Sequence, residues 1–123
     1  MILALVDDLL FGSKISGAAR QAGVPLKTAR SLDAALEAAR AATPSLVLLD
    51  LDAARLSPLA LVAAFKADPV LAQVRLVAFV SHVHADLIGQ ARAAGVDQVL
   101  ARSGFVAALP EIVRAISSPD ATA

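Results

Sequence analysis

The chain contains no cysteine, no tryptophan and no tyrosine, and its only aromatic side chains are four phenylalanines. Without cysteine there can be no disulfides, thiolate metal sites or redox-active thiols, which is compatible with a cytoplasmic protein. Eleven basic and eleven acidic residues give a formal net charge of zero. A nucleic-acid binder needs excess positive charge to neutralise phosphates, so we expect no direct contact with nucleic acid.

Long apolar runs are also absent. The opening stretch, Met1 to Val6, is apolar, but it lacks a basic leader and Asp7-Asp8 follow it directly. These acids interrupt the stretch long before a signal peptide or a membrane span could be completed. We therefore expect a buried first strand, a cytoplasmic location and no membrane partner. With 123 residues, 58% of them hydrophobic, the chain has enough material for one domain with a sizeable core.

Four short apolar runs each end at a polar or charged cluster. Runs of this length suit strands buried on both faces, as parallel sheets between helix layers require. The predicted strands are Ile2–Val6, Leu46–Leu49, Leu76–Val80 and Val99–Ala101, with a further short strand at Val24–Ala29.

Helical spacing fills the intervals between these strands. Gly23 and Gly95 are placed to end two helices, and Ser31 and Ser57 to cap two others. Pro110 is tolerated in the last helix because we expect it in the first turn. The predicted helices span about 13–22, 31–42, 58–67, 85–94 and 107–116.

Strand and helix thus alternate five times along the chain. This pattern predicts an α/β fold with a doubly wound, five-stranded parallel sheet in the order 2-1-3-4-5, the flavodoxin-like arrangement. The domain is expected to cover residues 1–117, and residues 118–123 to form a short flexible tail.

Acidic residues gather at the predicted strand ends. Open α/β sheets bind ligands at the carboxyl ends of their strands. Asp7, Asp8, Asp50 and Asp52 would bring up to four carboxylates to this edge, where a divalent cation or a strong base could balance their repulsion. Mg²⁺ is the natural candidate, because it takes oxygen ligands and joins carboxylates to phosphoryl oxygens.

The same edge carries the groups needed to handle a phosphoryl group. A carboxylate can accept it as an acyl phosphate when positive charge offsets the charge on the phosphoryl oxygens. Ser81 offers a hydroxyl donor, and Arg102 offers a planar cation that suits phosphate.

Three segments resemble the successive signatures of a two-component response-regulator receiver domain, the CheY-like family. They are Ile2 to Asp8, Pro44 to Asp50, and Ala93 to Asp97. The similarity extends over about Met1 to Ile116. It implies a phosphoacceptor role for Asp50 and Mg²⁺ ligation by Asp8 directly, by Asp7 through water and by the backbone carbonyl of Asp52. Ser81 matches the family's switch hydroxyl, and Arg102 falls where the family has its invariant lysine.

The chain departs from the receiver pattern on the side that senses phosphate. The family's lysine is followed by proline, whereas Arg102 is followed by Ser103-Gly104-Phe105. His82 stands where the family usually has a small residue, and Val99 where it has the aromatic switch residue. The acidic half of the site is therefore expected to be intact and the switch half to be altered.

Three functions follow from these patterns. The first is a stand-alone, atypical receiver in two-component or phosphorelay signalling, not an enzyme, which accepts phosphate on Asp50 with Mg²⁺. The second is a pseudo-receiver that works without phosphorylation, with Arg102 salt-bridged to the acids. A minor alternative is a haloacid-dehalogenase-type phosphatase, because Asp50-Leu51-Asp52 also resembles that nucleophile motif.

The receiver hypothesis also implies partners. They are a histidine kinase or phosphotransfer protein, and a downstream protein that contacts the face built by the fourth helix, fifth strand and fifth helix. A homodimer formed through that face is a further possibility.

Overall fold

The computed structural model describes residues 1–81 and 85–117. Strands and helices alternate along this part of the chain, as the apolar runs and helical spacing predicted. The strands are β1 (Ile2–Leu5), β2 (Leu26–Ala29), β3 (Leu46–Asp50), β4 (Arg75–Val80) and β5 (Gln98–Ala101). The helices are α1 (Leu9–Ala22), α2 (Leu32–Ala41), α3 (Pro58–Ala67), α4 (Ala85–Ala94) and α5 (Arg102–Ser117), with short 3-10 turns η1 (Ala54–Leu56) and η2 (Leu71–Gln73).

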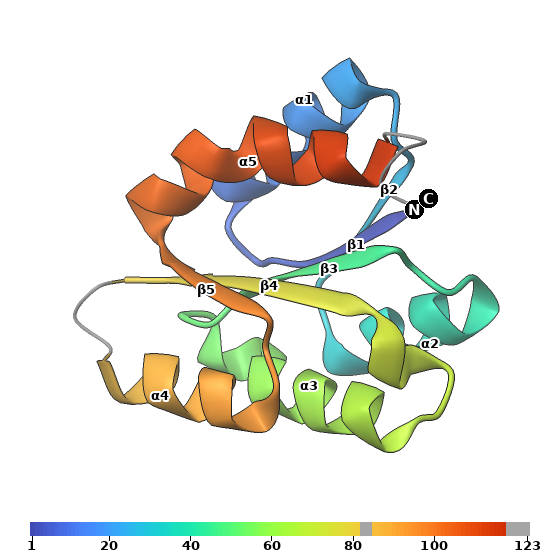
Figure 1. The fold of residues 1–123 in the computed structure, drawn as a ribbon, viewed down its shortest axis with the longest axis vertical. Coiled ribbons are helices and arrows are strands. Elements are labelled where there is room, and N and C mark those ends of the chain that lie inside the picture. Colours follow the sequence, from blue (N-terminus) through green and yellow to red (C-terminus); the bar gives the residue numbers. More distant parts are fainter. Residues whose placement is uncertain (82–84, 118–123) are drawn as a thin grey trace.

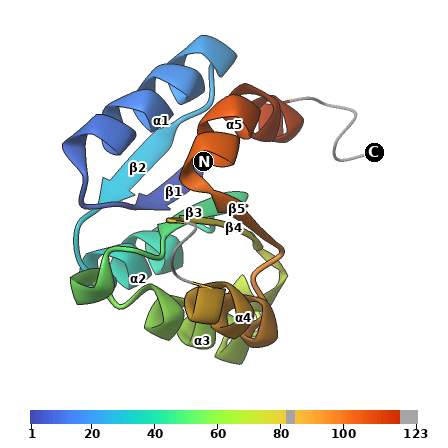
Figure 2. The same cartoon turned by 90° about the vertical axis from the view of Figure 1, so that its left-hand side faces the viewer.

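The five strands form one parallel sheet in the order β2-β1-β3-β4-β5, which confirms the predicted topology. Helices α1 and α5 cover one face of the sheet, and α2, α3 and α4 cover the other (Figures 1 and 2). Because all five strands run the same way, the residues that follow β1, β3 and β4 meet at one edge.

The core is divided by the sheet into two layers. Successive side chains of a strand point to opposite faces, so Leu3 and Leu5 pack toward α2 and α3 while Ile2 and Ala4 pack toward α1 and α5. The layer under α1 and α5 also holds Phe79 and Phe105, both fully buried. This aromatic layer lies directly beneath the carboxyl edge of the sheet and supports the site described below.

Helix α1 begins four residues before its predicted start. Asp8 is its N-cap, and the Oδ1 atom of Asp8 accepts hydrogen bonds from the backbone amides of Leu10, at 2.8 Å, and Phe11, at 3.2 Å. An aspartate placed just before an apolar segment is a common helix start, and Ser13 is the weaker signal. The capping role uses one oxygen of a carboxylate that the sequence assigned to metal binding.

Helix α5 begins at Arg102, not near residue 107, so the expectation that Pro110 lies in the first turn was wrong. The chain passes from β5 into α5 without a loop. Phe105, Leu109 and Val113 recur on one face and are buried against the sheet. Their burial offsets the cost of a proline inside a helix, which amounts to about 3 kcal/mol.

The helix caps are confirmed at three of the four predicted positions. The Ser31 hydroxyl accepts the Ala34 amide at 3.1 Å, and Gly23 and Gly95 follow their helices with positive φ values of 72° and 109°. Ser57 is the exception, because its backbone is left-handed, with φ 51°, and its side chain makes no capping hydrogen bond. A capping hydroxyl reaches the helix amides from an extended backbone, which Ser57 does not have.

Several predicted boundaries shift by a few residues. Strand β2 begins at Leu26 instead of Val24, and β3 and β4 include Asp50 and Arg75. The predicted tail, 118–123, lies outside the described residues. Within the described ranges, the longest and most apolar helices still fall short of what a membrane crossing requires.

Candidate functional site

A single guanidinium joins three carboxylates at the carboxyl edge of the sheet. Asp8 follows β1, Asp50 ends β3, and Asp52 lies two residues beyond it. The Nη1 atom of Arg102 lies 2.7 Å from Asp52 Oδ2 and 3.3 Å from Asp50 Oδ1, and Nη2 lies 3.4 Å from Asp8 Oδ2. The prediction that Asp8, Asp50, Asp52 and Arg102 meet at one edge of the sheet is therefore confirmed.

The position of Arg102 is unfavourable on local grounds, since a cation at the N-terminus of a helix opposes the helix dipole. Two contacts compensate. The three carboxylates supply negative charge, and the guanidinium lies over the ring of Phe11, with its central carbon 4.2 Å from the ring centroid. Phe11 stacks on Phe79 at 4.9 Å, and Phe79 stacks on Phe105 at 4.4 Å. Phe11 and Phe105 also stack, at 6.3 Å, so the three rings form one cluster, and Arg102 is held between the acids and this aromatic cluster.

Asp50 is the most deeply buried charged residue among those described, with only 3% of its surface exposed. Its Oδ1 atom accepts the backbone amide of Asp52 at 3.0 Å in addition to Arg102. Burial raises the pKa of Asp50 above its usual value, although the charge of Arg102 and the Asp52 amide pull it down. Asp50 is thus a carboxylate whose ionised form is costly and needs Arg102.

We expect Asp50→Asn to be more stable than the wild type by on the order of 1 kcal/mol at pH 7. The amide keeps an oxygen acceptor for Arg102 and removes a buried charge. Because the folded-state pKa of Asp50 is raised above 3.8, the wild type loses stability as the pH rises from that value through the folded-state pKa. Urea unfolding from pH 3.5 upward should show the advantage of asparagine growing across this window and then levelling. Equal stability of both proteins at every pH would contradict the prediction.

Asp52 connects the cluster to the end of β4. Its Oδ2 atom accepts the Arg102 guanidinium and, at 2.8 Å, the backbone amide of Ser81. Ser81 is therefore positioned beside the acids, as predicted, through its backbone. The donor role of its hydroxyl stays a prediction, and His82, which follows it, lies outside the described residues.

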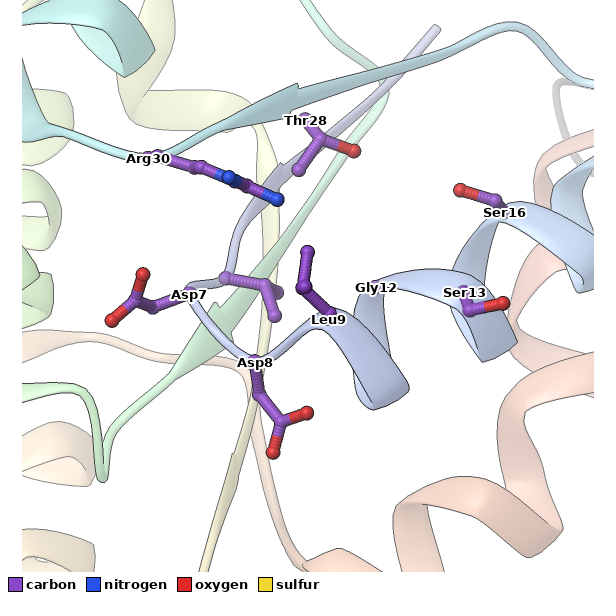
Figure 3. A pocket seen from close by; sticks show the side chains of 9 residues that line it. Asp7, Asp8, Leu9, Gly12, Ser13, Ser16, Thr28 and Arg30 are labelled. Atoms are coloured by element: carbon purple, nitrogen blue, oxygen red, sulfur yellow. The ribbon is translucent and has the colours of Figure 1, made fainter.

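Asp7 does not join the Arg102 cluster. Its two oxygens bind Arg55 of η1, with Nε 2.8 Å from Oδ2 and a second hydrogen bond through Nη2. This pairing lowers the pKa of Asp7 and raises that of Arg55. Figure 3 shows the side chains of Asp7 and Asp8 pointing in different directions from adjacent positions.

Arg55 and Phe11 are site residues that sequence reasoning missed. Arg55 did carry a signal, because it lies in the loop that follows the acidic strand end of β3 and so belongs to the same edge of the sheet. Phe11 carried none beyond its apolar character, since nothing in the sequence shows that its ring supports a guanidinium.

Protein donors engage the carboxylates where the sequence predicted Mg²⁺, and ligation of the metal there stays a prediction. Across residues 1–81 and 85–117, no three acidic or histidine side chains converge in the manner of a metal site. Asp8 is divided between the α1 amides and Arg102, Asp7 is bound to Arg55, and the backbone carbonyl of Asp52 accepts the Ala54 amide at 3.0 Å. Arg102 supplies the positive charge that a metal ion would otherwise bring.

Solved structures of other proteins share the fold of this chain. No family model and no curated protein matches the chain. Among solved structures, the phosphorylated cyanobacterial phytochrome response regulator RcpA is 25% identical, with a TM-score of 0.76 over 94% of this chain and 89% of RcpA.

Two further solved structures are similar over nearly their whole length. A response regulator from Hahella chejuensis is 17% identical, with a TM-score of 0.83 over 97% of this chain and 96% of the regulator. The chemotaxis response regulator CheY4 of Vibrio cholerae is 16% identical, with a TM-score of 0.80 over 94% of this chain and 96% of CheY4. The chain therefore has the fold of CheY-like receiver domains.

Proposed function

We propose that the chain is a receiver-type signalling module that acts through protein contact without phosphorylation, with Arg102 as a built-in counter-ion for its acidic site. One observation carries the proposal: the Arg102 guanidinium lies within 3.4 Å of oxygens from Asp8, Asp50 and Asp52. These are the atoms that a metal ion and a phosphoryl group would need.

The surroundings of Arg102 favour its staying in place. Its planar guanidinium presents several donors at once and stacks on Phe11, which a flexible lysine ammonium does less well. Displacing it would uncover the ring of Phe11 and leave the buried Asp50 without its partner. The site therefore supports one stable conformation better than a switch between two.

The output is proposed to use the face formed by α4, β5 and α5. Strand β5 is the last strand of the sheet and pairs only with β4 among the described strands. Val99 on this strand is half-buried and packs against the core. A downstream protein, or a second copy of the chain, is the proposed partner there.

A phosphorylated receiver is the second candidate, favoured by the gathering of Asp8, Asp50 and Asp52 at the expected edge and by likeness to phosphorylated RcpA. Response regulator Rcp1, which is 20% identical to this chain, has a Mn²⁺-bound form. In this version Asp50 accepts phosphate from a histidine kinase with Mg²⁺, and Arg102 must leave the acids. A phosphatase finds less support, because Arg102 and the Ser81 amide engage a carboxylate oxygen of Asp52, the residue that would serve as acid and base.

Incubation with Mg²⁺ and acetyl phosphate separates the two candidates. We expect the intact mass of the wild-type chain to stay unchanged, because Arg102 occupies the positions that the metal and the phosphoryl oxygens require. A functioning receiver treated in parallel must acquire a phosphoryl group. A phosphoryl adduct on the wild type that is lost in Asp50→Asn would replace the proposal with the second candidate.

A further inference from the structure

A hollow of about 320 Å³ opens beside the acidic edge, between α1 and the end of β2. It lies on the opposite side of β1 from the Arg102 cluster, and Arg102, Asp50 and Asp52 do not line it. Its volume falls at the lower end of the range for small-molecule sites. The hollow therefore adjoins the site just described, sharing Asp8 with it, and is large enough for a small organic molecule.

The polar groups of the hollow come from two elements. Figure 3 shows the Arg30 guanidinium extending into it from the end of β2, and the hydroxyls of Thr28 and Ser16 facing one another across it. Leu9, 70% exposed, projects between them and provides an apolar wall. A guanidinium, two hydroxyls and an apolar side chain thus surround the same hollow.

The charge inside the hollow is positive although two acids border it. In Figure 3 the carboxylates of Asp7 and Asp8 point away from the hollow, and each is bound to an arginine outside it, Asp7 to Arg55 and Asp8 to Arg102. Arg30 makes no hydrogen bond or salt bridge with another residue of the described ranges, and its charge only assists Arg55 in lowering the pKa of Asp7.

We propose that this hollow binds a small organic carboxylate. Its carboxylate pairs with the planar fork of Arg30, and its remaining polar atoms meet the hydroxyls of Thr28 and Ser16. A monoanion suits the site better than a phosphate dianion, because Arg30 is the one cation among the described residues that line the hollow. An organic body also covers the exposed side chain of Leu9, which an inorganic ion leaves in water.

An NMR titration of the full chain tests the proposal with benzoate and gluconate as probes. Benzamide and sorbitol are the neutral counterparts, and inorganic phosphate forms a third arm. We expect saturable shifts from at least one carboxylate, confined to the first two turns of α1 and the end of β2. Arg30→Gln should weaken that binding about tenfold, the loss of one charge-assisted hydrogen bond. Lys27→Gln removes the same charge from β2 outside the hollow and should leave affinity unchanged.

A second pair of variants tests the location without touching a charge. Gly12 lines the hollow, and a Cβ at Gly12 or Gly17 would meet no heavy atom within 4 Å, so both α1 positions accept a side chain. Gly12→Leu should abolish binding and Gly17→Leu should not. The proposal is overturned if neither carboxylate binds saturably, if the neutral counterparts bind equally well, if phosphate binds more tightly than both carboxylates, or if the two leucine variants behave alike. None of these outcomes depends on whether Asp50 is phosphorylated.

Discussion

Replacing Arg102 with alanine is expected to lower the free energy of unfolding by about 3 kcal/mol at pH 7, the cost of removing one partner from a buried ion pair. The loss leaves Asp50, of which 3% is exposed, as a buried charge without its cation. It also removes the cation that Asp8 and Asp52 share and uncovers the ring of Phe11. Urea unfolding followed by circular dichroism measures the change.

A control variant, a double variant and the pH dependence test whether the loss comes from the missing counter-ion. Arg92→Ala removes an exposed arginine from α4 and should change stability by less than about 0.5 kcal/mol. Arg102→Ala combined with Asp50→Asn should recover part of the loss, because the unpaired buried charge is gone. The loss should also shrink toward pH 4 as Asp50 takes up a proton. An Arg102→Ala variant as stable as Arg92→Ala would show that the guanidinium is not needed as a counter-ion.

The sequence predicted the composition of this cluster but not its state. Short apolar runs that end in Asp8, Asp50 and Ser81 fix which residues meet, because parallel strands bring their carboxyl ends to one edge. Whether Arg102 rests on those acids depends on distances of a few ångströms and on the start of α5. That start was misplaced, since Pro110 was used as a sign of the first turn while the buried face of Phe105 and Leu109 determines the helix.

The sequence also did not predict which acid pairs with which arginine. Asp7 and Asp8 are adjacent and chemically identical, so the sequence pattern predicted that both take part in binding the metal. Backbone geometry separates them: Asp8 turns to cap α1, and Asp7 turns toward Arg55, which lies 48 residues away in the chain. A contact of this range has no periodic signal, and only the folded structure shows which acid takes which arginine.

Phe79→Ala is expected to cost about 4 kcal/mol, as for large-to-small substitutions of buried aromatic residues. The ring is fully buried and stacks on both Phe11 and Phe105, which also stack on each other with ring centroids 6.3 Å apart, in the aromatic cluster beneath Arg102. Phe65→Ala, a fully buried ring in the other layer of the core, should destabilise by a similar amount. Thermal and urea unfolding of both variants measure this common effect.

Phe79 lies next to the acidic site and Phe65 does not, so only Phe79 should affect the position of Arg102. The milder variants Phe79→Leu and Phe65→Leu test this difference in proteins that still fold. Phe79 stacks on Phe11, and the Arg102 guanidinium lies over both rings, 4.2 Å from the centroid of Phe11 and 5.4 Å from that of Phe79. Phe79→Leu should therefore weaken the coupling between Arg102 and Asp50 in a double-mutant cycle. Phe65→Leu should leave that coupling as it is in the wild type. Equal coupling in both backgrounds would mean that the carboxylates alone hold Arg102. A selective loss would mean that the aromatic cluster sets the position of the cation, which ties the acidic site to the packing of α1 and α5.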